Sequence, residues 1–153
     1  MADGNPLWHG RLVGVPSEAL RALNDSLPFD QRMFREDIAG SRAHVRMLQA
    51  VGLLENAELS EILDALDTVE EEMEQETFDW AESDEDIHTA VERRATELTP
   101  AAAKMHTGRS RNDPVANDVR LVEIGEIASL KEVLESLNKA LHHREEDAHE
   151  RKD

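Results

Sequence analysis

The segment from His106 to Asp113 holds more side chains capable of chemistry than any other stretch of the chain. It reads His-Thr-Gly-Arg-Ser-Arg-Asn-Asp and combines two arginines, two hydroxyls, an amide and a carboxylate. Arg109 and Arg111 are permanently charged donors suited to carboxylates or phosphates, and Gly108 allows a tight turn that brings backbone N–H groups close to a ligand. These residue types predict a site for a small anion, although a solvated polar connection would have a similar composition.

The residues after this segment predict the start of a helix. Asp113 is a residue type that caps helix N-termini, and Pro114 fits the first helical position because the N–H it lacks would have no partner there. Such a start would place the arginines at the positive end of a helix, where anions bind favourably. The expected helix extends from Val115 to about Leu141.

This predicted helix is apolar on more than one side, which indicates that it requires several neighbours. Gly125 is a weak point inside it and costs about 1 kcal/mol relative to alanine. A chain that exposes such a helix is expected to self-associate loosely through it. The apolar positions that cover more than one face are Val119, Leu121, Val122, Ile124 and Ile127.

The spacing of apolar residues predicts an all-α chain, because aromatic residues are few and no β-branched run occurs. We expect an irregular arm over residues 1–16, a helical domain over 17–113, the long helix over 114–141 and a charged, fraying tail over 142–153. Within the helical domain, helices are predicted from Ser17 as cap to Leu23, from about Asp30 to Val51, from Asn56 as cap to Met73, and from near Asp84 to Leu98.

The composition excludes several classes of protein. The net charge is −17, with 34 acidic residues against 17 basic ones, and no lysine or arginine occurs between Arg46 and Arg93. Nucleic-acid binding is therefore not expected, since it requires a basic footprint. The absence of cysteine excludes disulfides and thiolate metal sites. No signal peptide or membrane-spanning run is evident, so we expect a cytoplasmic protein without a membrane partner. The histidines of the tail are interpreted as solvated, and no metal site is expected.

The arginine segment resembles the signature of the argininosuccinate lyases, which belong to the fumarase/aspartase superfamily. Three further blocks are similar to that family and occur in the same order, so that the resemblance covers roughly residues 7–121. These blocks are Leu7-Trp8-His9-Gly10-Arg11, then Leu23-Asn24-Asp25-Ser26-Leu27-Pro28-Phe29-Asp30, and Asp84-Glu85-Asp86-Ile87-His88-Thr89 followed by Glu92-Arg93-Arg94. The chain departs from the pattern at His9, where the family has glycine, and at Pro114, where it has glutamine.

The resemblance implies a fold, a reaction and a partner. The fold is the all-α N-terminal domain of the fumarase/aspartase type, followed by the start of a long helix that pairs across subunits in the central bundle of a homotetramer. The reaction is the reversible cleavage of argininosuccinate to arginine and fumarate in arginine biosynthesis, and it uses no metal or organic cofactor. The substrate and its two products are thus the expected small-molecule partners.

The resemblance also implies a set of substrate-binding residues. Arg111 falls on a carboxylate-binding position, and Ser26 and Asn112 fall on substrate-contacting positions. Asp86 and His88 belong to the block near the guanidinium of the substrate. The rest of the signature adds Thr107, Arg109 and Ser110. From the residues alone, His88 is instead a helix-start histidine bonded to its own turn, and Ser26 is a turn residue.

Two blocks of the family do not occur in the sequence. They are a Thr-His block followed by Leu-Gln, and a Gly-Ser-Ser loop that carries the catalytic serine. No catalytic residue is therefore assigned, and the chain alone is expected to be inactive, as the N-terminal part of a lyase. The alternative is a non-catalytic interaction or assembly module derived from that domain, which would bind lyase subunits through its long helix.

Overall fold

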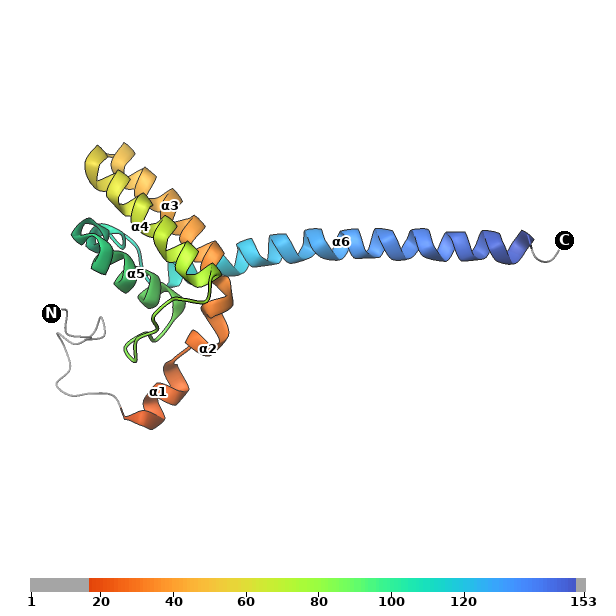
Figure 1. Cartoon of the computed structure of the whole chain (residues 1–153), viewed down its shortest axis with the longest axis horizontal. Helices are drawn as coiled ribbons and strands as arrows, with labels where there is room; N and C mark the ends of the chain where they lie inside the picture. Colours follow the sequence, from red (N-terminus) through yellow and green to blue (C-terminus); the bar gives the residue numbers. More distant parts are fainter. Residues whose placement is uncertain (1–16, 151–153) are drawn as a thin grey trace. The chain divides into compact units, whose positions relative to one another are not determined.

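The structure is a computed structural model that describes residues 17–150, with side chains described as far as Glu145. Within residues 17–150 it contains six α-helices, two short 3-10 helices and no strand, which confirms the predicted all-α class (Figure 1). The predicted N-terminal arm lies outside the described residues. The chain divides into two units, the first ending at Asp118 and the second beginning at Val119.

The first described segment consists of short helices. Ser17 caps helix α1 as predicted, since its side chain accepts a hydrogen bond from the N–H of Leu20. The long helix expected from Asp30 begins later, at Phe34, because a separate helical turn and a 3-10 turn precede it. The elements are α1 (Glu18–Asn24), α2 (Leu27–Asp30) and η1 (Gln31–Met33).

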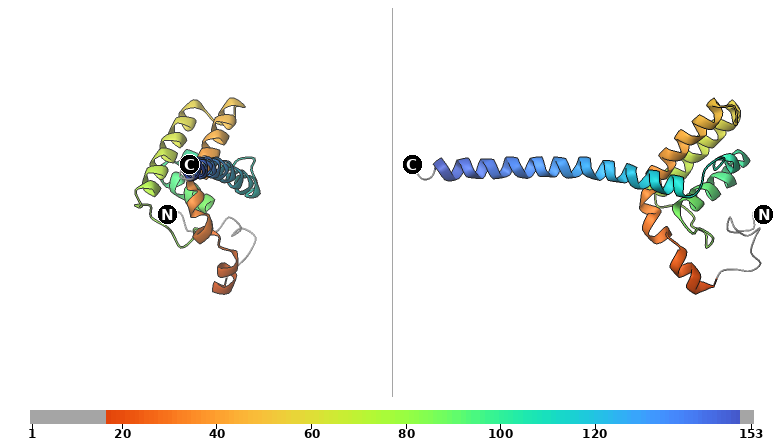
Figure 2. Two further views of the ribbon diagram at one scale, coloured as in Figure 1. Left: turned by 90° about the vertical axis from the view of Figure 1, so that its right-hand side faces the viewer. Right: turned by 180° about the vertical axis from the view of Figure 1, so that it is seen from behind.

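Three longer helices and a 3-10 helix pack together around the core of the first unit. Helices α3 and α4 lie side by side as an antiparallel pair, and α5 with η2 packs against them (Figure 2). The elements are α3 (Phe34–Ala50), α4 (Asn56–Glu74), α5 (Ile87–Leu98) and η2 (Pro100–Lys104). The largest fully buried apolar side chains come from all three helices, namely Ile38, Val45, Leu48, Ile62, Leu66, Val69, Ile87 and Val91.

The ends of these helices agree with the sequence in part. Gly52 has a φ of +78°, as expected of a residue that ends α3. The predicted cap of α4 is wrong, because Glu55 occupies that position and forms a capping box with Glu58. Asn56 instead accepts a hydrogen bond from the side chain of Gln49.

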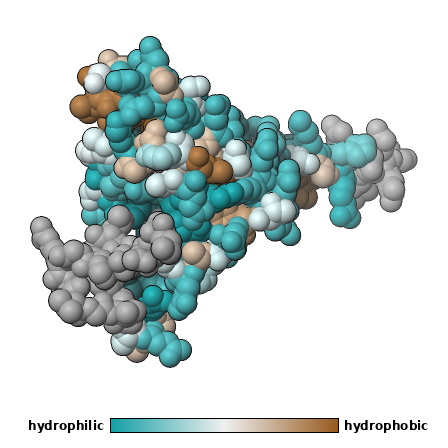
Figure 3. All heavy atoms as spheres, turned by 60° about the vertical axis from the view of Figure 1, so that its left-hand side comes forward, coloured by the Kyte–Doolittle hydropathy of each residue, from teal (hydrophilic) through white to brown (hydrophobic). Residues whose placement is uncertain are grey.

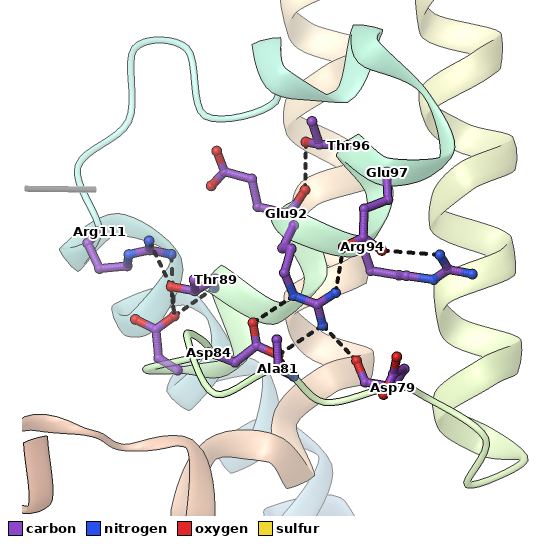
Figure 4. A network of polar contacts seen from close by, with 11 residues as sticks. Asp79, Ala81, Asp84, Thr89, Glu92, Arg94, Thr96, Glu97 and Arg111 are labelled. Carbon is purple, nitrogen blue, oxygen red and sulfur yellow. Dashed lines mark hydrogen bonds and ion pairs between the residues drawn. The ribbon is translucent and has the colours of Figure 1, made fainter. Parts of the chain in front are cut away.

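The loop before α5 is held by a buried ion pair. Arg93 donates to both carboxylate oxygens of Asp84, at 2.8 and 2.9 Å, and to the carbonyl of Asp79 (Figure 4). Asp84 is 5% exposed. Because Asp84 is used in this way, α5 begins at Ile87 rather than near Asp84, with Asp86 as its N-cap. The pair therefore fixes the residues that lead into Asp86.

The last helix is longer than predicted. Helix α6 (Asn112–Glu150) begins before Val115 and continues beyond Leu141, through residues of high helix propensity such as Arg144 and Glu145. Its first turns, through Asp118, belong to the first unit.

From Val119 onward, α6 exposes most of its large apolar side chains. The exposed fractions of Ile124 and Ile127 are both 66%. The apolar sides predicted for this helix are therefore present, and the described chain does not cover them. On the face of the molecule that Figure 3 shows, the described residues are mostly hydrophilic, with apolar side chains in small patches. Among the described residues, no helix combines the length and apolar character needed to cross a bilayer.

Candidate functional site

The segment from His106 to Arg111, here called the signature loop, connects η2 to α6 through local turns. The N–H of Thr107 donates to the carbonyl of Lys104 at 3.0 Å, and the N–H of Arg109 donates to that of His106 at 3.1 Å. Gly108 has a φ of +74°, which confirms the expected tight turn at that glycine. Beyond this turn, Arg111 reaches the start of α5, whereas Arg109 bonds back to Met105.

The start of α6 differs from the prediction. Asp113 is not the N-cap but the second residue of the helix, and its carboxylate accepts a hydrogen bond from the N–H of Ser110 at 2.7 Å. Pro114 is buried and lies in the first helical turn. Because first-turn N–H groups have no partner inside the helix, the proline costs no helical hydrogen bond. The carboxylate of Asp113 thus stabilises the end of the signature loop.

Arg111 lies against the N-terminus of α5. Its Nη2 donates to the hydroxyl of Thr89 at 3.2 Å, and its Nη1 is 3.5 Å from Oδ1 of Asp86 (Figure 4). The same Oδ1 accepts hydrogen bonds from the N–H and the hydroxyl of Thr89, both at 2.7 Å. Nη1 is buried and has no hydrogen-bond partner within the described chain. Arg111 is thus held in place by α5, with one buried donor that the described chain does not use.

Arg109 is also incompletely paired. Its Nη2 donates to the carbonyl of Met105 at 3.1 Å, whereas its buried Nε has no partner among the described residues. Burial lowers the pKa of Arg109, and the charges of Asp37 and Glu92 counteract that shift. An arginine remains charged despite such a shift. Two partly buried cations with unused donors are suited to carboxylate binding.

Ser26 is connected to the same end of α5. Its hydroxyl donates to Oδ2 of Asp30 at 2.6 Å, and its N–H donates to the carbonyl of Glu85 at 2.9 Å. Oδ1 of Asp30 in turn accepts a hydrogen bond from the N–H of Ile87 at 3.0 Å. Ser26 is therefore more than a turn residue, since it joins α2 to the residues on either side of Asp86.

The side chain of His88 bonds to a residue far away in the sequence, so the local bond that the residues alone predict is wrong, while its role near the substrate guanidinium stays a prediction. His88 is 5% exposed, and its Nδ1 forms a hydrogen bond with Oδ1 of Asp37 on α3. It is not bonded to its own turn, and it lies below the surface rather than on it. Oδ2 of Asp118 is 3.6 Å from the same Nδ1. His88 thus joins α5 to α3 and to the first turns of α6.

The charges of these three buried groups influence one another. Burial alone would lower the pKa of His88, but the hydrogen bond and the charge of Asp37 raise it above its ordinary value. Burial, followed by the charge of Asp37, raises the pKa of Asp118 to about 7. The buried atoms His88 Nε2 and Asp118 Oδ2 lack hydrogen-bond partners in the described part of the chain. The pKa values of His88 and Asp118 therefore depend on each other's charge and on that of Asp37.

Asp37, His88 and Asp118 also form the group of described residues whose ligand atoms lie close enough to hold a metal ion, within 4.8 Å of one another. Both carboxylates, however, face the same ring nitrogen, and the hydrogen bond between Asp37 and His88 already uses two of the candidate ligand atoms. A proton shared between the ring nitrogen and the carboxylates thus accounts for the contacts of these side chains at least as well as a bound metal ion does.

The other residues predicted to bind substrate in the segment from His106 to Asp113 are exposed to solvent. Thr107, Ser110 and Asn112 are exposed. Sequence reasoning did not identify Asp37 or Asp118 as members of the site. Asp37 did carry a signal, because it lies on the apolar stripe of α3 beside Ile38, where a carboxylate requires a partner. Asp118 carried the same signal, because Val115, Leu121 and Val122 are three or four residues away on the same side of α6.

Comparisons with known proteins identify the family of the chain. A family model described as Lyase matches residues 10–151. The chain is 47% identical to the argininosuccinate lyase of Thermus thermophilus over 135 residues, which are 88% of this chain and 29% of that protein. It is 46% identical to the argininosuccinate lyase of Roseiflexus castenholzii, over 88% of this chain and 30% of that protein. The probable argininosuccinate lyase of Schizosaccharomyces pombe is 46% identical, over 79% and 27% respectively.

The chain spans about three tenths of the length of these curated relatives. The family model, in contrast, covers nearly all of the chain, from the first residues before α1 to the end of α6. The signature loop, Ser26 and the start of α5 all fall inside the matched region. On this match, the chain belongs to the lyase family.

Proposed function

We propose that this chain supplies the N-terminal, substrate-binding part of an argininosuccinate lyase, an enzyme of the cytoplasm that reversibly cleaves argininosuccinate to arginine and fumarate. The observation that carries the proposal is the pair of arginines in the signature loop. Arg109 and Arg111 are both partly buried, and each has a guanidinium nitrogen without a hydrogen-bond partner in the described chain. Such donors fit the carboxylates of a succinyl group.

Each residue near the loop has a role in this proposal. Arg111 binds a carboxylate of the succinyl group, and Arg109 adds positive charge beside it. Asp86 is the acidic group closest to Arg111 and is suited to the guanidinium of the arginine moiety. The other contributions come from the amide and hydroxyl groups of Ser26, Thr107, Ser110 and Asn112. His88 is buried and stabilises the start of α5 through its contact with α3. It would reach substrate only if the surrounding helices moved.

The cleavage requires a base that removes a proton from the succinyl carbon next to a carboxylate. Negative charge then builds on that carboxylate, and fixed cations and amide donors stabilise it while the guanidinium leaves. The residues of the signature loop supply the stabilising donors. We assign no base to this chain, and we propose that turnover requires the family's Thr-His and Gly-Ser-Ser blocks from a longer protein or from other chains.

The test is a titration of the isotope-labelled chain with argininosuccinate and with fumarate, followed by NMR. We expect the amide signals of Arg109 to Asn112 to shift, and Arg111→Ala to abolish the shifts at the same ligand concentrations. Arg35→Ala is the matched control, because Arg35 is an exposed arginine whose partner is Glu74 on α4. Shifts that persist in Arg111→Ala, or that are absent from the unmodified chain, would contradict the proposal.

A second measurement tests the need for further residues. The chain, purified from a host that lacks its own lyase, is incubated with argininosuccinate, and fumarate is measured by its ultraviolet absorbance. We expect no fumarate above the level without protein. Production of fumarate at a rate that depends on the concentration of the chain would show that its own residues suffice.

One observation favours a second function, that of an assembly module. Along the second unit, apolar residues on α6 follow each other at alternating steps of three and four, which is the spacing of helices that pair in bundles and coiled coils. All are more than half exposed, namely Ile127, Leu130, Leu134, Leu137 and Leu141. We propose that this row pairs with copies of the same helix, as in the homotetramer that the family resemblance implies.

The two functions are separated by the mass of the particle in solution. Sedimentation or light scattering of the full chain is expected to show concentration-dependent association, which Leu130→Gln with Leu137→Gln removes. Glu123→Gln with Glu126→Gln is the matched control on the same helix. A strictly monomeric chain at all concentrations would exclude the assembly role and leave the binding role of the signature loop untouched.

A further inference from the structure

One face of α3 lies behind the signature loop and the first turns of α6. Asp37, Gly40 and His44 are spaced three and four residues apart, so they lie on the same side of the helix. Asp37 contacts His88, as described above. A Cβ atom on Gly40 would lie 2.9 Å from Nδ2 of Asn117, which shows how closely α6 approaches α3 at that point.

His44, one turn further along this face, reaches the signature loop itself. Its Nε2 is 2.9 Å from the carbonyl oxygen of Thr107. The backbone hydrogen bonds of the loop are local, since Thr107 and Arg109 each donate to a residue three positions earlier. They shape the turn but do not attach it to another helix. Arg111 attaches the end of the loop to α5, and His44 attaches its beginning to α3.

The hydrogen bond from His44 can orient the signature loop because of where the carbonyl of Thr107 lies in the chain. The carbonyl of Thr107 belongs to the peptide group that joins Thr107 to Gly108, and Gly108 is the residue whose positive φ turns the chain. A hydrogen bond to that carbonyl fixes the plane of the peptide group at the pivot. The direction in which Arg109 and Arg111 leave the turn depends on that plane, because glycine itself restrains the backbone least.

A histidine is suited to this task. Its ring has only two side-chain torsions, so holding it in place costs less conformational entropy than holding a longer donor such as lysine. Burial lowers the pKa of His44, and the nearby charge of Arg109 lowers it further, while the hydrogen bond to Thr107 opposes the shift. The neutral ring with its proton on Nε2 donates to the carbonyl without adding a second cation beside Arg109.

We propose that His44 is a positioning residue, which donates a hydrogen bond from Nε2 to the carbonyl of Thr107 and thereby orients the arginines of the signature loop. The assignment of a ligand to those arginines rests on the proposed function, but the contact and its effect on the loop do not. His44 acts through the loop and is not a substrate contact.

The test compares His44→Gln with His44→Leu in the full chain. Glutamine carries its Nε2 donor the same number of bonds from the backbone, whereas leucine removes the donor at similar volume. The readout is the hydrogen-exchange rate of the Thr107 and Arg109 amides. We expect His44→Leu to accelerate exchange about three- to tenfold, the effect of losing one hydrogen bond, and His44→Gln to remain within about twofold of the unmodified chain. His142→Leu, on the exposed part of α6, is the control.

A spectroscopic measurement on the unmodified chain keeps the proposal testable if a variant fails to fold. Long-range nitrogen–proton spectra at pH 8 should show His44 as a neutral ring protonated on Nε2. A ring protonated on Nδ1, or equal exchange rates in the leucine and glutamine variants, would overturn the proposal. If His44→Leu frees the loop but argininosuccinate does not bind to the unmodified chain, the positioning role stands and the proposed function fails.

Discussion

Between Phe34 and Asp118 most of the large apolar side chains are packed between helices, whereas from Val119 onward most comparable side chains are exposed along a single helix. Ile62 on α4 is fully buried, and Ile127 on α6 is 66% exposed. The first unit can therefore be stable through its own packing, while the second unit has no packing of its own to stabilise it. The contrast shows that the described apolar core lies in the first unit, whereas the apolar side chains of the second unit lack a partner within the described chain.

The largest expected effect is on the free energy of unfolding, and it differs between a substitution in the first unit and one in the second. Ile62→Ala should lower the free energy of unfolding by about 2–5 kcal/mol, because it leaves a cavity in the core of the first unit. Leu134→Ala, on the exposed row of α6, should change it by less than about 0.5 kcal/mol in the monomer. Urea unfolding followed by circular dichroism at low protein concentration measures both. Similar losses in the two variants would mean that α6 is already covered in solution.

The next effect concerns the buried charges of the first unit. An acid whose pKa is raised on folding stabilises the folded state at low pH and loses that contribution as pH rises. For Asp118, the loss falls between about pH 4 and its folded pKa of about 7. His88, whose pKa is also raised, loses its contribution as pH rises through its own folded pKa. The cluster should thus be weaker at pH 8 than at pH 5.

The substitution Asp118→Asn isolates the contribution of the Asp118 carboxyl to the pH dependence of stability. The variant should gain stability relative to the unmodified chain as pH rises from 5 to 8, by about 2 to 3 kcal/mol. Glu123→Gln, an exposed carboxylate on the second unit, should show no such gain. Urea unfolding at a series of pH values provides the comparison, and a constant difference between Asp118→Asn and the unmodified chain would contradict the raised pKa.

The smallest effect compares two helical glycines. Alanine at Gly125 has no neighbour within 4 Å, so it should stabilise α6 by about 0.5–1 kcal/mol through helix propensity alone. Alanine at Gly40 gains the same propensity but must displace the side chain of Asn117. We expect Gly40→Ala to be neutral or destabilising in thermal unfolding, and Gly125→Ala to increase helicity. Equal gains would show that α3 and α6 are less closely packed than described.

The sequence predicted the helices better than their ends. Apolar periodicity located α3, α4, α5 and α6, because burial of one face is repeated over many residues. The N-cap residues were less predictable, since several neighbouring residues are of a type that can cap a helix. Tertiary contacts decide which of them occupies the N-cap position. Asp84 is used by Arg93, which leaves Asp86 to cap α5, and Glu55 rather than Asn56 caps α4.

The candidate site was predictable where its residues share one segment. The signature loop was identified from its residue types, and Ser26 and Asp86 from the resemblance. The environment of His88 was not predicted, because its partners lie far away in the sequence. Asp37 precedes it by 51 residues, and Asp118 follows it on another helix. Neither periodicity nor a local motif reports such a contact.

The hydrogen bonds of Ser26 and Asp30 have a consequence for the order of folding. The α3–α4 pair is joined by a short connection and can form early, since closing a short loop costs little entropy. Asp30 and Ile87, in contrast, are separated by 57 residues. Contacts between such distant residues slow folding, because loop closure precedes the gain from the contact. We therefore expect the start of α5 to form its native contacts after the helical pair, and slow-folding variants to lose these contacts before they lose helicity.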